Sequence, residues 1–323
     1  MRSVPASKAF SCAFAVMAAL CAAFALFYVF SGVDAHTWDY NIPRRLKVVC
    51  AIAVVGVSVG ISSVIFQTIT ANYILTPSIM GFDNLYLLLQ TLVIYFWGGG
   101  QLSMMDSPAD FTLTILLMIC ASTAVFFVMF KGGKESVYRT VLVGVALGMA
   151  FGGLSTFMQV FIDPSEFSVL EGRMFASFNR INVQLLGISA AVVCAAGAWF
   201  FSDLKTYDAI ALGRERSISL GVNYRAVVLK SMVVVAVLTS ASTALVGPLT
   251  FLGILVVSLT RALLPTYRHG ILVPGAILAA VCALLFGMIV TERALHFAVP
   301  MSVIIDFAGG LFFMLLLGRV KNL

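Results

Sequence analysis

The sequence has few charged residues for its length. Only 11% of the 323 residues are Asp, Glu, Lys or Arg, whereas 61% are hydrophobic, and the mean hydropathy is +1.05. A water-soluble globular protein could not hide so much apolar surface in one core. Repeated apolar runs of about 20 residues match the ~30 Å hydrocarbon layer of a bilayer, and the alternating pattern of a membrane barrel is absent. The sequence therefore predicts an all-α integral membrane protein, because helices satisfy their own backbone hydrogen bonds in lipid.

Residue patterns typical of metal centres and disulfide frameworks are also missing. The six cysteines are scattered singly through apolar runs, and no two of them form a CxxC pair. The three histidines lie far apart and show no metal-ligand spacing. The sequence contains neither HExxH nor GxSxG. We therefore interpret the cysteines as small buried apolar residues, and we expect no metal and no covalent chemistry in this chain.

A nucleotide-binding loop is absent as well. The closest approach to one is GGKE at residues 132–135, where Glu replaces the Ser or Thr that binds magnesium and the upstream glycine spacing is wrong. We therefore expect no cofactor in this chain. An energy-consuming role would need a separate subunit that binds ATP and magnesium.

About ten apolar segments are long enough to be membrane spans. The first of them resembles a signal peptide at its start, but it is longer than the ~7–15 residues of a signal h-region, which favours an uncleaved helix. Gly247-Pro248, a pairing typical of a helix start, precedes the eighth. The segments are residues 9–30, 46–68, 77–97, 111–130, 139–162, 183–201, 226–246, 250–264, 271–291 and 302–317.

The distribution of positive charge predicts the orientation. Ten spans place both termini on one side of the membrane, and the loops on that side hold most of the Lys and Arg residues. The positive-inside rule therefore predicts an N-in/C-in topology. The net charge of +6 then reflects the attraction of these loops to an anionic inner leaflet rather than nucleic-acid binding.

One polar segment, residues 202–225, interrupts the apolar pattern and lies inside in this orientation. It reads SDLKTYDAIALGRERSISLGVNYR. We expect Asp208 to cap a first short helix and Gly213 to end it. We expect Gly221 to end a second short helix. Two short helices outside the membrane are suited to insertion into a groove on a soluble partner. A solvated loop without a partner is the alternative.

Small and polar residues within the spans are candidates for close helix packing or for a transport path. Gly144, Gly148 and Gly152 recur every four residues, a spacing that lets helix backbones approach closely. Burying a carboxylate at membrane depth costs free energy, so such a residue is a functional-site candidate. Asp306 is the candidate of this kind, and the alternative is that it lies at the start of a helix near the membrane interface. The other polar residues in the spans are Gln67, Asp83, Gln90 and Gln159.

Four blocks of sequence resemble, in the same order, the signatures of the FecCD/BtuC-type permeases. These permeases are the membrane subunits of ABC importers for siderophores and vitamin B12. The stretch at residues 76–83 is closer to permeases for catechol-type ferric siderophores, whereas Asn41 departs from the family pattern of outer arginines. The blocks are IPRRL at 42–46, the pattern Q…AN..LTP..MG at 67–81 (which adds Asn72 to the candidates for the path), ALG…SLGV at 211–222, and GPLTFLG at 247–253 followed by R…RHG..VPG at 261–275.

The resemblance implies a BtuC-like subunit with a single permease domain over residues 1–323. It implies a second permease subunit around a central path, with a heterodimer favoured and a homodimer as the alternative. It also implies an extracytoplasmic substrate-binding protein that docks at Arg44, Arg45 and Arg293. A cytoplasmic ABC ATPase dimer is expected to grip the polar segment through Ala211, Leu212, Gly213, Arg214, Ser219, Leu220 and Gly221.

The function implied is that of a permease subunit that imports a ferric siderophore through the bacterial inner membrane. ATP hydrolysis takes place in the partner ATPase. The alternatives are the same fold importing haem or cobalamin, and a secondary transporter that needs no ATPase. The small number of ionisable residues in the spans counts against a proton-driven carrier.

Overall fold

The computed structural model describes residues 6–32, 38–98, 108–130, 137–179 and 181–320. These residues form helices joined by turns and irregular segments, and none of them lies in a β-strand. The prediction of an all-α fold is therefore confirmed for the described part of the chain.

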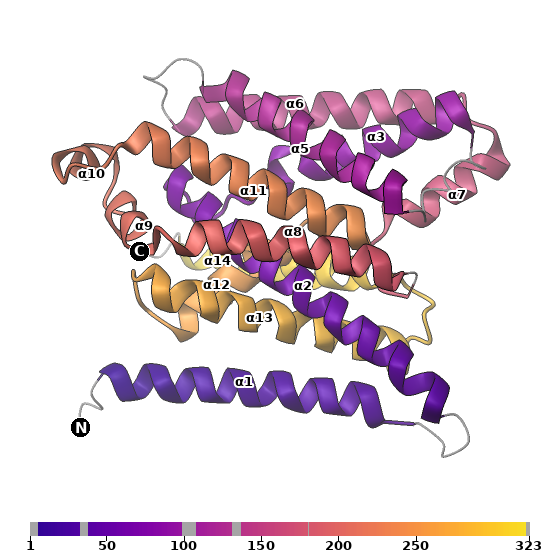
Figure 1. The fold of residues 1–323 in the computed structure, drawn as a ribbon, viewed down its shortest axis with the longest axis horizontal. Helices are drawn as coiled ribbons and strands as arrows, with labels where there is room; N and C mark the ends of the chain where they lie inside the picture. Colours follow the sequence, from indigo (N-terminus) through magenta and orange to yellow (C-terminus); the bar gives the residue numbers. More distant parts are fainter. Residues whose placement is uncertain (1–5, 33–37, 99–107, 131–136, 180, 321–323) are drawn as a thin grey trace.

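The helices form one bundle in which the long elements run close to a common direction, as Figure 1 shows. Two short helices, α9 (Leu204–Ile210) and α10 (Arg214–Ser219), project from one end of the bundle, which we call the polar end. The other elements are α1 (Ala6–Phe30), α2 (Trp38–Thr70), η2 (Ser78–Met80), α3 (Phe82–Trp97), α5 (Pro108–Phe130), α6 (Val137–Gln159), α7 (Pro164–Met174), α8 (Val183–Phe201), α11 (Tyr224–Val246), α12 (Leu252–Leu263), α13 (His269–Ile289), η3 (Val290–Ala294) and α14 (Met301–Val320).

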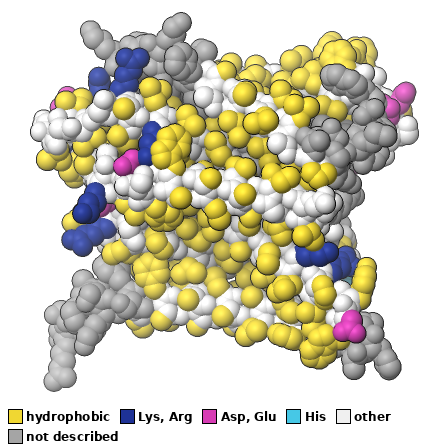
Figure 2. Space-filling model, in the orientation of Figure 1, with side chains coloured by type: hydrophobic (Ala, Val, Ile, Leu, Met, Phe, Trp, Pro, Cys, Tyr) yellow, Lys and Arg dark blue, Asp and Glu magenta, His cyan; other side chains and the backbone are white. Residues whose placement is uncertain are grey.

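Six of the described helices are long and apolar enough to cross a membrane, namely α1, α2, α6, α8, α11 and α13. Four shorter apolar helices, α3, α5, α12 and α14, accompany them. Each of the ten apolar segments predicted from the sequence overlaps one of these helices. Figure 2 shows apolar side chains over the middle of the visible face, and Lys and Arg side chains toward its two ends. This is the distribution expected of a protein whose middle is surrounded by lipid.

The core is built around α2, α11 and α13. α2 packs along both α13 and α11, and 67% of the apolar window in α2 and in α11 is buried, against 17% in α1. Ala51, Ile52 and Val55 of α2 have no exposed surface. α1 accordingly lies along the edge of the bundle (Figure 1).

Two helices begin beside the middle of a neighbouring helix rather than at an end of the bundle. A Cβ atom at Gly81, just before α3, would lie 2.4 Å from the Cα of Gly148 in the middle of α6. A Cβ atom at Gly309, in the middle of α14, would lie 2.7 Å from the Cβ of Phe251, just before α12. The irregular segments before α3 and α12 therefore pack between helices, and glycine permits that approach.

The start of α12 corrects a detail of the sequence analysis. Gly247 does not begin a helix: its φ of 102° is in the left-handed region, and its N–H donates to the Thr243 carbonyl at 2.8 Å, which closes α11. α12 begins only at Leu252. The pairing of Gly247 with Pro248 thus marks the end of one helix rather than the start of the next.

Candidate functional site

The polar segment forms two short helices separated by a glycine. Gly213 has a φ of 95° and Gly221 a φ of 81°, so glycine permits both the break between α9 and α10 and the exit from α10. The prediction that Asp208 caps the first helix is wrong, because α9 begins at Leu204, four residues earlier. Asp208 lies within α9, and its carboxylate binds a different helix.

The outer surface of the polar segment combines exposed aliphatic and positively charged side chains. Leu212, Ile218 and Leu220 are 48%, 53% and 63% exposed. Arg214 and Arg216 are exposed on α10 beside them. The seven residues expected to contact a partner, Ala211, Leu212, Gly213, Arg214, Ser219, Leu220 and Gly221, therefore lie together, and all but the half-buried Gly213 are exposed.

Hydrogen bonds hold the two short helices against each other. The buried Ser217 hydroxyl of α10 lies 2.8 Å from the Ala209 carbonyl of α9 and 2.6 Å from the Gly213 carbonyl. α9 has seven residues and α10 has six, which is too short for either to be stable as an isolated helix in water. The pair is thus stabilised by its own contacts and by its attachment to the bundle.

Tyr207 fastens α9 to the bundle. Its side chain is fully buried, with its ring centroid 4.8 Å from that of Phe200 and 6.0 Å from that of His269. Its hydroxyl and that of Ser231 on α11 are 3.0 Å apart. Burial raises the pKa of Tyr207, so the phenol stays protonated and keeps this hydrogen bond. A second attachment to α11 is the ion pair between Asp203 and Lys230.

A third attachment joins α9 to α13 and α2. Oδ1 of Asp208 lies 2.7 Å from both the backbone nitrogen and Nδ1 of His269, the first residue of α13. Nε2 of the same ring lies 2.8 Å from Oγ1 of Thr68 in the last turn of α2. This contact has no signal in the sequence, because the spacing of the histidines indicates only whether they could bind a metal.

At the opposite end of the bundle, two of the three arginines expected to dock a partner make contacts within the chain. Arg45 donates to the carbonyls of Tyr28, Val29 and Ser31 at 3.1, 3.1 and 2.6 Å, and to Glu292 at 3.2 Å. Arg293 donates to the backbone and side chain of Ser31. Both arginines therefore stabilise the C-terminal end of α1. The third, Arg44, is exposed to solvent.

The glycine stripe of α6 packs against the start of α3. Gly148 approaches Gly81 closely, and Gly152 lies beside the side chain of Asn84, whose Nδ2 donates to the Gly148 carbonyl at 2.9 Å. Gly144 is buried in the same contact, with its carbonyl oxygen near Gly81. The structure therefore places this stripe in helix packing within the subunit.

Gln159 lies farther along the same pair of helices. Its Nε2 lies 3.0 Å from the Ser155 hydroxyl and 3.3 Å from that of Thr91. The two hydroxyls lie 2.8 Å from each other. This polar cluster ties α6 to α3.

The remaining polar candidates are spread over different parts of the bundle. Asp306 lies five residues into α14, and its Oδ1 accepts from the Phe251 backbone nitrogen at 3.0 Å, which caps α12 from a neighbouring helix. Gln67 is fully buried, and both polar atoms of its side chain lack a partner among the described residues. Asn72, at the end of α2, accepts from the Ile74 nitrogen at 3.0 Å. Gln67 and Asn72 lie together at the C-terminal end of α2, where the Asn72 nitrogen donates to the Gln67 carbonyl at 3.2 Å, whereas Asp306 contacts the start of α12.

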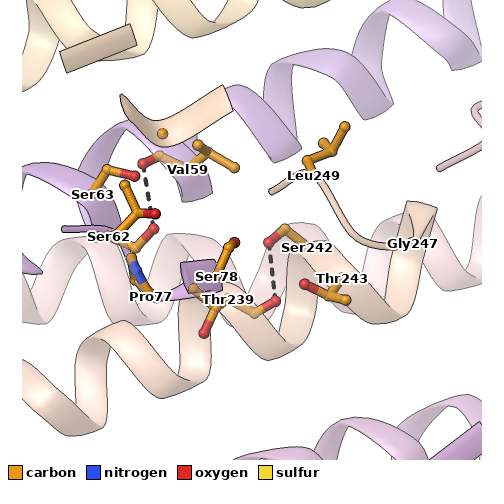
Figure 3. A pocket seen from close by; sticks show the side chains of 12 residues that line it. Val59, Ser62, Ser63, Pro77, Ser78, Thr239, Ser242, Thr243, Gly247 and Leu249 are labelled. Carbon is orange, nitrogen blue, oxygen red and sulfur yellow. Dashed lines mark hydrogen bonds between the residues drawn. The ribbon is translucent and has the colours of Figure 1, made fainter. Parts of the chain in front are cut away.

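A small cavity of ≈ 20 Å³ lies where the irregular segments before α3 and α12 meet α2 and α11. Figure 3 shows the hydroxyl groups that line it, including those of Ser62, Ser78, Thr239 and Thr243. This volume has room for about one water molecule. The cavity is too small to hold a ligand much larger than water.

Comparison with known proteins identifies the family. The model described as the FecCD transport family matches residues 9–319. Over 301 residues the chain is 44% identical to the petrobactin import system permease protein YclO of Bacillus subtilis (strain 168), which covers 93% of this chain and 94% of that protein. It is 31% identical over 291 residues to the petrobactin import system permease protein FatC of Bacillus anthracis, which covers 90% and 82%.

The fold agrees with that of a solved transporter. The structure described as "an inward-facing conformation of a putative metal-chelate type ABC transporter" matches with a TM-score of 0.82 and 20% identity, covering 96% of this chain and 99% of that one. The expected BtuC-like fold and multi-pass membrane location agree with these matches. Since the family model spans nearly all of the chain, the resemblance noted in the sequence is confirmed, and the protein belongs to the FecCD transport family.

Proposed function

We propose that this chain is the permease subunit of an ABC importer that carries a ferric siderophore across the bacterial cytoplasmic membrane. The 44% and 31% identical relatives are both named for petrobactin import, so iron-loaded petrobactin is the proposed cargo. Haem and cobalamin are the alternatives, since a vitamin B12 import permease of Vibrio cholerae is 25% identical over 285 residues.

The proposed topology has ten spans with both termini in the cytoplasm. α1 begins and α14 ends at the polar end of the bundle, where α9 and α10 also lie (Figure 1). The excess of Lys and Arg in the loops on this side supports a cytoplasmic location. The polar segment would then face a cytoplasmic partner, and the end that carries α7 would face outward.

The observation that carries the proposal is the exposed surface of the polar segment. Leu212, Ile218 and Leu220 are exposed on two helices that project beyond the bundle, next to Arg214 and Arg216. Aliphatic side chains surrounded by arginine are suited to a partner groove with an apolar centre and a polar rim. In this family context the partner is a cytoplasmic ABC ATPase dimer, which binds the ATP and magnesium that this chain has no loop to hold.

The transport path is proposed to lie between this chain and a second permease subunit. The hydroxyl-lined cavity beside α2 and α11 is too small for cargo. Large apolar side chains are exposed on α6, including Met149 and Phe157, and on α14, including Phe307 and Met314. These faces contact either lipid or the second subunit. A heterodimer is proposed, and a homodimer is the alternative outcome.

An extracytoplasmic binding protein is proposed to dock at the opposite end. Arg44 and Arg293 are both exposed there, although Arg293 also donates to Ser31, whereas Arg45 is largely buried and bound to the C-terminal end of α1. Charge pairs on such a surface set orientation and encounter rate more than affinity.

The test is a reconstitution of the complex in proteoliposomes, with iron-loaded petrobactin as the probe. Leu220→Glu places a charge in the centre of the proposed groove contact, and we expect ATPase co-purification and iron uptake to fall by at least about 30-fold, the effect of a hot-spot residue. Leu220→Met is the matched control and should retain both activities, because Met fills similar volume. Wild-type uptake and stimulated ATP hydrolysis in Leu220→Glu would reject the ATPase contact.

A second arm of the experiment tests the class of transporter. Uptake by the wild-type chain in the absence of any ATPase subunit would show a secondary transporter. Uptake of cobalamin or haem, with no uptake of iron-loaded petrobactin, would reject the cargo but keep the importer. Mass spectrometry of the purified complex distinguishes a heterodimer from a homodimer.

A further inference from the structure

The carboxylate of Asp208 caps a helix that belongs to a different part of the chain. Its Oδ1 accepts from the His269 backbone nitrogen, in the first turn of α13, at 2.7 Å. The first N–H groups of a helix have no partner within the helix, and the helix dipole favours a negative charge there. Arg268, at the N-cap position of α13, makes no side-chain capping bond. The polar segment therefore supplies the cap that α13 itself lacks.

The ring of His269 extends this contact to a third helix. Because a carboxylate only accepts hydrogen bonds, Nδ1 of His269 carries the hydrogen that faces Asp208 at 2.7 Å. Nε2 lies 2.8 Å from the Thr68 hydroxyl. The Thr68 hydroxyl has one hydrogen, which it donates either to Nε2 of a neutral ring or to the Val64 carbonyl at 2.8 Å while it accepts from a charged ring. Asp208, His269 and Thr68 thus join α9, α13 and α2 in one chain of short hydrogen bonds.

Two of these three residues are buried, and Asp208 has 33% of its side chain exposed. His269 is 2% and Thr68 is 7% exposed, and the ring of Tyr207, adjacent to Asp208, lies against the ring of His269. α13 and α2 pack along each other in the centre of the bundle. A displacement of α9 is therefore transferred to the ends of both central helices. The ion pair of Asp203 with Lys230 is more exposed and reaches α11 instead, and exposed pairs hold geometry weakly.

We propose that Asp208, His269 and Thr68 form the joint through which movement of the polar segment reaches α13 and α2. This inference rests on the proposed function, in which an ATPase moves that segment. The three residues are positioning residues, since their contacts lie within the chain. Without the joint, α9 and α10 still bind the ATPase, but ATP hydrolysis is no longer converted efficiently into opening of the path.

The experiment measures iron-loaded petrobactin imported per ATP hydrolysed by the full complex in proteoliposomes. In Asp208→Ala the ratio is expected to fall about tenfold, within the range for mutations that alter coupling between sites. Asp208→Asn should keep the ratio within about twofold, since its side-chain oxygen accepts the same two bonds. A general loss of folding would instead lower the amount of assembled complex, which is measured separately by ATPase co-purification.

Two further pairs of variants make the test specific. Thr68→Val removes the last partner of the joint and should lower the ratio, whereas Thr70→Val should not, because the Thr70 hydroxyl bonds only carbonyls of its own helix. Asp203→Ala, which removes the other carboxylate bound to the bundle, should also leave the ratio unchanged. If Asp208→Ala does not assemble, Thr68→Val and Thr70→Val decide the question.

The outcomes separate this inference from the proposed function. Unchanged ratios in Asp208→Ala and Thr68→Val, or an equal fall in Asp203→Ala, would overturn the joint while wild-type import remains driven by ATP. Absence of ATP-driven import by the wild-type complex would overturn the proposed function itself.

Discussion

The two ends of the bundle use their arginines differently. At the polar end, Arg214 and Arg216 of α10 are exposed, and Leu220 beside them is 63% exposed. At the opposite end, Arg45 has only 12% of its side chain exposed and binds three carbonyls and Glu292. The first end presents a surface, whereas the second ties its own helices together.

This difference shows that charge in a loop does not by itself indicate a binding surface. Arg44 and Arg45 are neighbours in the chain, yet one is exposed and the other holds the end of α1. The C-terminal carbonyls of a helix lack partners, and a guanidinium with five donors can satisfy several of them at once. An arginine that matches a docking motif in the sequence can therefore bind the carbonyls of a helix end in its own chain instead.

The largest effect on stability is expected for a substitution at the opposite end of the bundle. Arg45→Ala removes the donors for the α1 carbonyls and leaves Glu292 without its closer cation. We expect a loss of about 2–3 kcal/mol in the free energy of unfolding, typical of bonds to a largely buried charged group. Unfolding of the detergent-solubilised protein measures it. Equal stability in Arg45→Ala and the wild type would show that Arg45 is available for docking after all.

The fold was largely predictable from the sequence because lipid imposes a length on each apolar helix. All ten predicted segments overlap helices, and Gly213 and Gly221 marked the limits of α10 correctly. The irregular starts of α3 and α12 were not predictable, since they depend on contacts of Gly81 with Gly148 and of Phe251 with Gly309. Hydropathy contains no information about such contacts between distant segments.

The candidate site was predictable only where it is local. The exposed residues of α9 and α10 follow one another in the chain, so their composition alone predicted an exposed polar segment, and its role as a contact surface stays a prediction. Asp208 and His269 are 61 residues apart, and Arg45 and Glu292 are 247 apart. Neither pair has a spacing that identifies it, because each depends on which helices the fold places side by side.

A smaller effect on stability is expected for a substitution at the polar end. Gly213→Ala introduces a Cβ with no atom within 4 Å, so the only cost is that of a non-glycine residue at a φ of 95° and a ψ of 164°, a region almost exclusive to glycine, about 1–3 kcal/mol. We expect faster amide exchange throughout α9 and α10 in hydrogen-exchange mass spectrometry. Gly187→Ala is the control: it also has open space around it but lies within α8, so it should be neutral or slightly stabilising. The same response in both variants would contradict a strained break at Gly213.

The smallest effect on stability is expected for Arg44, and it sharpens the comparison most. Arg44→Ala should change the free energy of unfolding by less than about 0.5 kcal/mol, as is usual for an exposed side chain, in contrast to its neighbour Arg45. Its effect should instead fall on the association rate of the binding protein with the complex, measured by stopped-flow fluorescence. That rate should drop several-fold at low salt and much less at high salt, since screening removes steering by exposed charges. Arg44→Lys keeps the charge and should keep the rate. A large loss of stability in Arg44→Ala, with no change in association, would instead place Arg44 with Arg45 among the residues that hold the bundle together.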